Sequence, residues 1–311
     1  MSWQTVVTEP SELGESPFWH PQEERLYWVD IAARQILRAN LVTGALQRWA
    51  MPSEPGCIAP ARDNGEDGGL VIALRDGIYR APAWGGELRL LARAGHDTAT
   101  TRFNDGRADP LGRFWAGTIY EPRDRALAAL YSLDCRPRSG GAAPRLQRQA
   151  GDALTANGLA WSPDARTMYW SDTPRHVIHA WDWDAASNAM TRQRVFQQFP
   201  GKPEGWQAGM PGYGGRPDGA AVDAQGNYWC AMYEGRRLLQ LSPTGAVLAD
   251  IPVPVQCPTM PCFGGADLRT LYLTSARHGR PAAELAAMPL SGCVFSMRVE
   301  VPGLPVNFFV D

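Results

Sequence analysis

The sequence has little of what most nucleic-acid-binding and membrane proteins need. Its 30 Lys and Arg residues are balanced by 32 Asp and Glu residues, giving a net charge of −2, and they form no basic run. Nucleic acids and anionic bilayers are bound through concentrated positive charge, so neither is expected as a partner. No apolar stretch approaches the roughly 20 residues of a membrane-spanning helix. The first residues also lack the basic and apolar regions of a signal peptide, and we therefore expect a soluble, cytoplasmic protein.

Several familiar catalytic and metal-binding patterns are also missing. The six cysteines do not form the two close pairs of a zinc site, so we interpret them as buried or incidental reduced thiols: Cys57, Cys135, Cys230, Cys257, Cys262 and Cys293. No G-x-S-x-G nucleophile motif occurs. The five histidines show no metal-binding spacing along a helix, which argues against a histidine-based mechanism: His20, His96, His176, His179 and His278.

Aromatic residues, glycine and proline are abundant. The chain has 12 Trp, 32 Gly and 26 Pro residues. Glycine and proline interrupt helices, whereas aromatic side chains suit strands. The composition therefore favours an all-β fold with many turns.

Six copies of one strand pattern recur along the chain. Each copy is centred on a residue of its second strand, and these residues are Trp28, Val71, Trp115, Trp170, Trp229 and Tyr272. Their spacings of 43, 44, 55, 59 and 43 residues are typical of β-propeller blades. We predict a single domain over residues 1–311, a six-bladed β-propeller with four-stranded blades. Closure of the ring requires a strand that covers the last blade, and we expect the N-terminal Thr5–Val7 to do this beside Val294–Val299.

Two of these spacings exceed the others, so two copies carry insertions. Arg136–Gly151 is polar and predicts a surface loop. Phe199–Arg216 contains Trp206 and Tyr213 among glycines and prolines, and it leads directly into Asp218. We expect this second insertion to border the central pocket and to influence substrate choice. The alternative is a solvent-facing loop without a role.

Polar residues occur in four predicted turns, each of which leads into the first strand of a blade. The turns are Gly14–Pro17, Arg102–Gly106, Ala156–Gly158 and Pro217–Gly219. An Asn-Gly or Asp-Gly pair alone is an ordinary turn signal. Equivalent positions of a propeller converge on its axis, so we expect four side chains to face one another there: Glu15, Asn104, Asn157 and Asp218. Two carboxylates with one or two amide oxygens would form a site for Ca²⁺, Mg²⁺ or Mn²⁺, and the lack of His and Cys argues against a dedicated zinc site without excluding zinc.

The motifs around these residues resemble those of a known family. GESPFW, RFNDGRADPLGRFWAGT, NGLAWSPD and RPDGAAVDAQGNYWCA are similar to motifs of the SMP-30/gluconolactonase/regucalcin family, whose members are six-bladed sugar lactonases. The resemblance extends from about Glu12 to Arg277. It implies one divalent metal ion, Ca²⁺ first with Zn²⁺, Mn²⁺, Mg²⁺ or Fe²⁺ as alternatives, held by Glu15, Asn157 and Asp218. It also implies three substrate contacts, although the loop EPRDRALAAL around the last departs from the family pattern: Arg102, Asn104 and Glu121.

Lactone hydrolysis needs a polarised carbonyl group and an activated water molecule. A divalent ion would polarise the carbonyl oxygen, and Asp218 would take the proton of the water as general base, with a metal-bound hydroxide as the alternative. We predict a gluconolactonase-like hydrolase that converts an aldono-1,4- or 1,5-lactone to the aldonic acid. Its partner is a small sugar lactone, and we expect a monomer or a weak homo-oligomer. The alternatives are a non-sugar lactonase or esterase, and a non-catalytic propeller that contains a cation and binds or senses a sugar.

Overall fold

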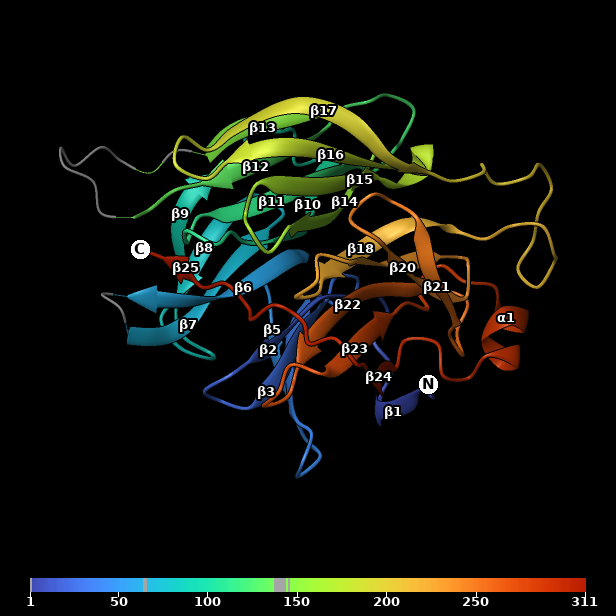
Figure 1. Cartoon of the computed structure of the whole chain (residues 1–311). Helices are drawn as coiled ribbons and strands as arrows, with labels where there is room; N and C mark the ends of the chain where they lie inside the picture. The colour runs from blue at the N-terminus through green and yellow to red at the C-terminus, as the bar shows by residue number, and fades with distance from the viewer. Residues whose placement is uncertain (1, 64–65, 137–143, 145) are drawn as a thin grey trace.

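The strands of the chain form six sheets that are arranged as blades around a common axis (Figure 1). The computed structural model describes residues 2–63, 66–136, 144 and 146–311. Within each sheet the consecutive strands pair antiparallel, from the inner strand at the axis to the outer strand. The predicted all-β, six-bladed propeller is therefore confirmed.

Each blade takes its strands from one of the sequence copies. Blades one and two contain β2 (Gly14–His20), β3 (Arg25–Asp30), β4 (Gln35–Asn40), β5 (Ala45–Ala50), β6 (Pro55–Asp63), β7 (Glu66–Leu74), β8 (Gly77–Ala81) and β9 (Arg89–Arg93). Blades three and four contain β10 (Thr101–Ala108), β11 (Phe114–Tyr120), β12 (Ala128–Leu133), β13 (Leu146–Ala153), β14 (Ala156–Trp161), β15 (Thr167–Asp172), β16 (Val177–Asp184) and β17 (Ala189–Gln198). Blades five and six contain β18 (Arg216–Val222), β19 (Tyr228–Tyr233), β20 (Arg237–Leu241), β21 (Val247–Pro252), β22 (Pro258–Gly264), β23 (Thr270–Ser275) and β24 (Val294–Arg298).

The N-terminal strand completes the sixth blade. β1 (Gln4–Val7) pairs antiparallel with β24, and Thr5 lies opposite Phe295. This is the closure that the sequence predicts for Thr5–Val7. It covers the edge of β24 and joins the two ends of the ring.

The C-terminal segment, residues 303–311, crosses the end of the propeller that lies opposite the loop before β18. We call this segment the strap. It begins at a bridge between Gly303 and Asp223 and ends in β25 (Phe309–Val310), which pairs parallel with β6 as a fifth strand of blade two. Figure 1 shows the C terminus at the opposite end of the molecule from the loop that precedes β18. The sequence does not predict this strap.

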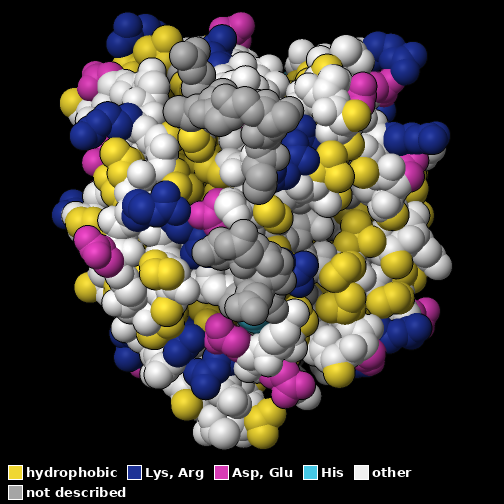
Figure 2. Space-filling view, turned by 90° about the vertical axis from the view of Figure 1, so that its left-hand side faces the viewer, with side chains coloured by type: hydrophobic (Ala, Val, Ile, Leu, Met, Phe, Trp, Pro, Cys, Tyr) yellow, Lys and Arg dark blue, Asp and Glu magenta, His cyan; other side chains and the backbone are white. Residues whose placement is uncertain are grey.

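Only short helical elements accompany the sheets in the described part of the chain. They are the 3₁₀ turn η1 (Thr173–Arg175) and the helix α1 (Ala282–Ala287). Among the described residues we find no helix of the length and apolar character that crossing a membrane requires. On the end of the molecule shown in Figure 2, basic and acidic side chains are interspersed.

The hydrophobic core lies between neighbouring blades. Trp115 of blade three, for example, is fully buried against Trp161 and Trp183 of blade four, with ring centroids 5.7 and 6.3 Å away. Each sheet buries its faces against the sheets on either side, so no blade could be stable alone. This packing fixes the inner strands relative to one another, and the inner strands carry the site.

The four predicted polar turns are strands in the structure, and this part of the prediction is wrong. Glu15, Asn104, Asn157 and Asp218 lie within β2, β10, β14 and β18, each at or next to a break in the pairing register. Such a break is a β-bulge, which uses small residues and positive φ as a turn does. Gly158 has φ 62°. A Cβ atom at Gly219 would come within 2.4 Å of Met260 in the next blade, so this glycine allows close packing of two inner strands.

The first insertion differs in part from the predicted loop, whereas the second is a loop. Half of Arg136–Gly151 lies outside the described residues, but Leu146–Gly151 belongs to β13. Phe199–Arg216 connects β17 to β18 by turns, and its aromatic side chains pack together, with Trp206 and Tyr213 centroids 4.9 Å apart. Tyr213 Oη also contacts His176 Nε2 at 2.8 Å, which fastens this loop to blade four.

Candidate active site

The inner strands bring polar side chains together at one end of the propeller axis. The four residues predicted at the axis line one cavity of about 490 Å³, and all four are at least nine-tenths buried: Glu15, Asn104, Asn157 and Asp218. They come from blades one, three, four and five, and the bulges aim them inward. The cavity therefore collects two carboxyl and two amide groups from distant parts of the chain.

A chain of hydrogen bonds connects three of the blades across the cavity. Arg102 Nη1 donates to Asn104 Oδ1 at 2.9 Å. Asn104 Nδ2 donates to Asn157 Oδ1 at 2.8 Å, and Asn157 Nδ2 donates to Asp218 Oδ1 at 2.6 Å. The side chains of Asn104 and Asn157 are thus each held in one orientation by the next blade.

The two carboxyl groups are strained electrostatically. Burial raises the pKa of Glu15 well above its ordinary value, and the charges of Asp218 and Asp105 raise it further. Burial also raises the pKa of Asp218, to about 8, against the opposing effect of Arg216. Glu15 Oε2 is buried and has no hydrogen-bond partner. A pair of buried carboxylates with an unsatisfied oxygen is an environment that a cation would stabilise.

The residues present fit a divalent cation with oxygen ligands. In the described chain no three His, Cys, Asp or Glu side chains gather closely enough to form a metal site by themselves. The predicted set needs only two carboxylates, Glu15 and Asp218, with the amide oxygen of Asn157 as the third donor. Because Asn157 now points Nδ2 at Asp218, its amide would have to rotate by half a turn to present Oδ1 to a cation.

Glu121 lines the same cavity and is bound by an arginine outside the cavity lining. It accepts two hydrogen bonds from Arg75, at 2.9 and 3.1 Å. Its Oε1 is 3.8 Å from Nε of Arg102. Glu121 therefore contacts two guanidinium groups, and its carboxylate has lone pairs beyond the two that accept from Arg75.

Several lining residues escape sequence reasoning. Arg123, Arg216, Tyr233 and His278 also line the cavity. They follow or begin strands at the same end of the propeller, and no Asn-Gly or Asp-Gly pair marks them. Asp105 is the fifth group to be added: it is buried beneath the site, and burial raises its pKa. Only its position next to Asn104 in the same inner strand could have indicated it.

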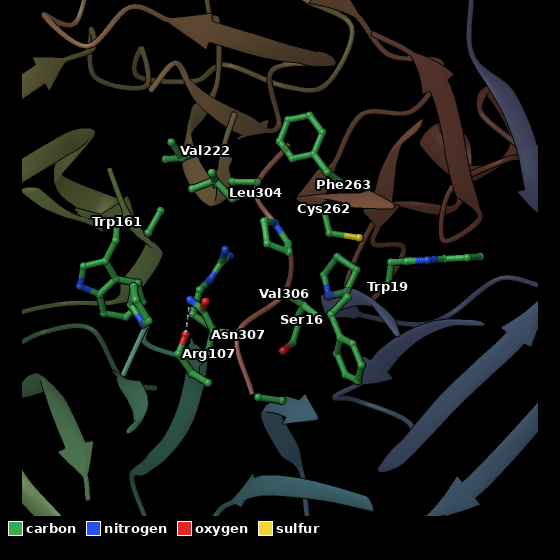
Figure 3. A pocket seen from close by; sticks show the side chains of 18 of the residues that line it. Ser16, Trp19, Arg107, Trp161, Val222, Cys262, Phe263, Leu304, Val306 and Asn307 are labelled. Carbon is green, nitrogen blue, oxygen red and sulfur yellow. Dashed lines mark hydrogen bonds between the residues drawn. The ribbon is translucent and has the colours of Figure 1, made fainter. Parts of the chain in front are cut away.

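A second cavity, of about 260 Å³, lies on the axis toward the strap (Figure 3). On β2, Glu15 lines the first cavity, whereas Trp19 lines the second. Figure 3 shows apolar side chains around this space, among them Val222 and Phe263, with Leu304 of the strap. Its described lining includes no Asp, Glu or His. It therefore lacks the groups that hydrolysis requires, and the polar cavity is the candidate active site.

Comparisons with known proteins agree with this assignment. Residues 13–277 match the model of the SMP-30/gluconolactonase/LRE-like region. The chain is 46% identical over 304 residues to 6-deoxy-6-sulfogluconolactonase of Pseudomonas putida, with 98% of this chain and 97% of the relative covered. It is 32% identical to regucalcin of Danio rerio, with 96% and 95% covered. Among solved structures, regucalcin of Agrobacterium tumefaciens, described as a calcium-binding protein, is 26% identical, covers 99% of this chain and 97% of its own, and has a TM-score of 0.87.

Proposed function

The chain belongs to the SMP-30/gluconolactonase/LRE-like family and is a lactone-hydrolysing enzyme, and we propose that it opens a sugar lactone to the aldonic acid in the axial cavity, with one divalent cation bound there. One observation carries the proposal. Glu15 and Asp218 are buried in one axial cavity, the charge of Asp218 raises the pKa of Glu15, and an oxygen of Glu15 has no partner. Burying such a pair costs free energy, and groups with perturbed pKa values of this kind cluster at functional sites.

Glu15, Asn157 and Asp218 are the residues that would hold the cation. We propose Ca²⁺ first, because its flexible coordination by carboxylate and amide oxygens suits this donor set; Zn²⁺, Mn²⁺, Mg²⁺ and Fe²⁺ are the alternatives. When bound, the cation would polarise the lactone carbonyl and stabilise the negative charge that develops on its oxygen.

Asp218 is the proposed general base. Its carboxyl group is buried at the axis, and in the cation-free chain it accepts a 2.6 Å hydrogen bond from Asn157 Nδ2, which a bound cation would replace. Such a carboxylate can accept the proton of a water molecule that attacks the lactone carbonyl. The opened product then carries a carboxylate, and the displaced ring oxygen becomes a hydroxyl group.

Arg102 and Glu121 are the proposed contacts to the sugar hydroxyl groups. Arg102 is buried within the cavity and retains guanidinium N–H groups beyond those that bind Asn104 and the carbonyl oxygen of Phe103. Asn104 differs, because both hydrogens of its Nδ2 are already donated, to the carbonyl oxygen of Ala156 and to Asn157. We therefore propose that Asn104 mainly positions Arg102 and Asn157, with one lone pair of Oδ1 left for the substrate.

The proposal is tested by measuring acid release from glucono-lactone and other sugar lactones, with the rate without enzyme subtracted. The P. putida relative is named for a 6-sulfonated gluconolactone, so that lactone joins the first panel, with non-sugar lactones as the competing substrates. We expect Asp218→Asn to lower kcat by about 10²–10⁴-fold, the range of a general base. Asp164→Asn, at an exposed turn outside the cavity, is the matched control. Wild-type activity in the Asp218 variant would remove its proposed role.

A further inference from the structure

We propose that the mouth of the axial cavity contains a subsite for an anionic group of the lactone, and that Arg123 is its principal ligand. This inference rests on the proposed function, because it concerns the part of the same substrate that lies farthest from the reacting carbonyl. It names a substrate class: sugar lactones that carry a sulfonate, phosphate or carboxylate group.

Arg123 is an unpaired cation at the entrance of the cavity. It lies in the connection between β11 and β12, lines the cavity and is exposed. Within the part of the chain that the structure describes, its side chain has neither an ion pair nor a hydrogen bond. The two other arginines of the cavity wall differ, since Arg102 bonds to Asn104 and Arg216 pairs with Glu234 at 2.9 Å.

Arg123 shares its cavity with the reacting centre, because Arg123, Asp218 and Glu15 line the same space. A ligand that touches Asp218 in this cavity is therefore within reach of the mouth where Arg123 lies. A lactone whose carbonyl lies at the axis would therefore extend its far end toward Arg123.

Further positive charge gathers next to Arg216 of the cavity wall. Three cationic groups lie within 3.0 Å of Glu234, and they are Lys202, Arg216 and Arg280. Arg280 also pairs with Glu284 at 2.6 Å, so three cations stand against two carboxylates. Lys202 and Arg216 both belong to the insertion Phe199–Arg216. Of the residues of this insertion, Arg216 alone lines the cavity, and Lys202 adds its charge beside it.

A guanidinium group suits an oxyanion in particular. It presents N–H donors in a planar fork that pairs with two oxygens of a sulfonate, phosphate or carboxylate. At an exposed position it is already hydrated, so the gain on binding is moderate and sensitive to salt. Neutral sugar hydroxyls would gain much less from the same contact. Arg123 therefore selects between lactones and leaves the chemistry at Asp218 unchanged.

The test compares three lactones with the full-length enzyme: glucono-lactone, its 6-deoxy-6-sulfo analogue and its 6-phosphate. We expect Arg123→Ala to lower kcat/KM for at least one of the two anionic lactones by about 10- to 100-fold, the value of one charge-assisted contact. The change should lie mainly in KM, and glucono-lactone should be hydrolysed with unchanged kcat/KM. Arg123→Lys should restore part of the loss because it keeps the charge and loses the fork. Comparison of the sulfonated with the phosphorylated lactone shows which of these two anionic groups the subsite binds.

Arg125→Ala is the matched control. Arg125 lies in the same connection and is exposed, but it bonds to the Tyr120 hydroxyl at 2.6 Å and does not line the cavity. Equal losses for all three lactones, no loss for either anionic lactone, or the same loss in the Arg125 variant would each overturn the subsite. A wild-type enzyme that hydrolyses glucono-lactone but prefers neither anionic lactone would overturn it too, while the proposed function stands. A wild-type enzyme that hydrolyses no sugar lactone would instead overturn the proposed function.

Discussion

At the scale of single residues, the site is costly because two buried carboxyl groups line one cavity. Glu15 and Asp218 are 7% and 5% exposed. Asp105 adds a third buried carboxyl group, and the charges of Arg102 and Arg216 offset the cost only in part, because the pKa values of Glu15 and Asp218 stay raised. The cost falls on the ionised forms, and this makes the stability of the protein depend on pH and on cations.

We expect the cation-free protein to lose stability as pH rises from about 4 to about 8. The pKa of Asp218 is raised to about 8 in the folded chain, whereas an exposed aspartate titrates near 4. Between these values the folded state binds more protons than the unfolded state, so the free energy of unfolding falls as pH rises. The effect is fully developed above the folded pKa.

Thermal melts from pH 5 to pH 8.5 in the presence of a chelator would measure this dependence. Asp218→Asn should flatten it, whereas Asp250→Asn, at an exposed carboxylate paired with Arg237, should retain the wild-type slope. Addition of Ca²⁺ should raise the melting temperature more at pH 8 than at pH 5, because protonated ligands bind cations poorly. Parallel curves for wild type and Asp218→Asn would show that Asp218 titrates normally.

At the scale of single elements, the same hydrogen bond between an aspartate and a tryptophan closes a hairpin in two blades. In ADPLGRFW and VDAQGNYW the first aspartate accepts a hydrogen bond from the tryptophan six residues later, at 2.9 Å in both Asp109–Trp115 and Asp223–Trp229. Each carboxylate also accepts backbone N–H groups of its own turn. The aspartate thus closes the hairpin and fixes a tryptophan between blades.

We expect Asp223→Ala to destabilise the protein by about 2–3 kcal/mol, because it leaves buried donors of the turn and the Trp229 indole without an acceptor. Asp109→Ala should have a similar effect. Asp164→Ala is the comparison: its carboxylate closes an exposed turn through Ser162 and Arg166, so we expect a loss below about 1 kcal/mol. Urea unfolding of the three variants measures the differences. Equal losses at Asp223 and Asp164 would show that the indole contact is unimportant.

Sequence patterns predict the second strands of the blades better than the first. The second strands are short, mainly apolar runs around a tryptophan, tyrosine or valine, and all six central residues lie where the repeat predicts them. The first strands are interrupted by bulges, and Asn157-Gly158 or Asp218-Gly219 has the composition of a turn. A β-bulge and a turn both favour small residues and positive φ, so the local sequence cannot distinguish them. Pairing with the neighbouring strand determines which of the two forms.

At the scale of the whole molecule, closure of the ring of blades holds the inner strands, and with them the site, around the axis. The sequence predicts that β1 covers β24, because a ring of four-stranded blades leaves one strand to be supplied. It does not predict the strap, since residues 303–311 have no alternating pattern and gain their only described strand by pairing with β6. In the same way, it predicts the residues that meet at the axis but not Arg123, which lies in the connection between β11 and β12, or Glu234, whose ion pairs form only in the folded chain.

The central claim is that the axial carboxylates hold one divalent cation that lactone hydrolysis requires. The most direct measurement is acid release from glucono-lactone by enzyme stripped of metal, with elemental analysis to confirm removal, followed by titration with Ca²⁺ and then with the alternative cations. We predict that stripping abolishes the enzymatic rate and that one equivalent of cation per chain restores it, whereas Glu15→Gln enzyme fails to recover. Full activity in metal-free enzyme, or recovery that needs no carboxylate at position 15, would contradict the claim.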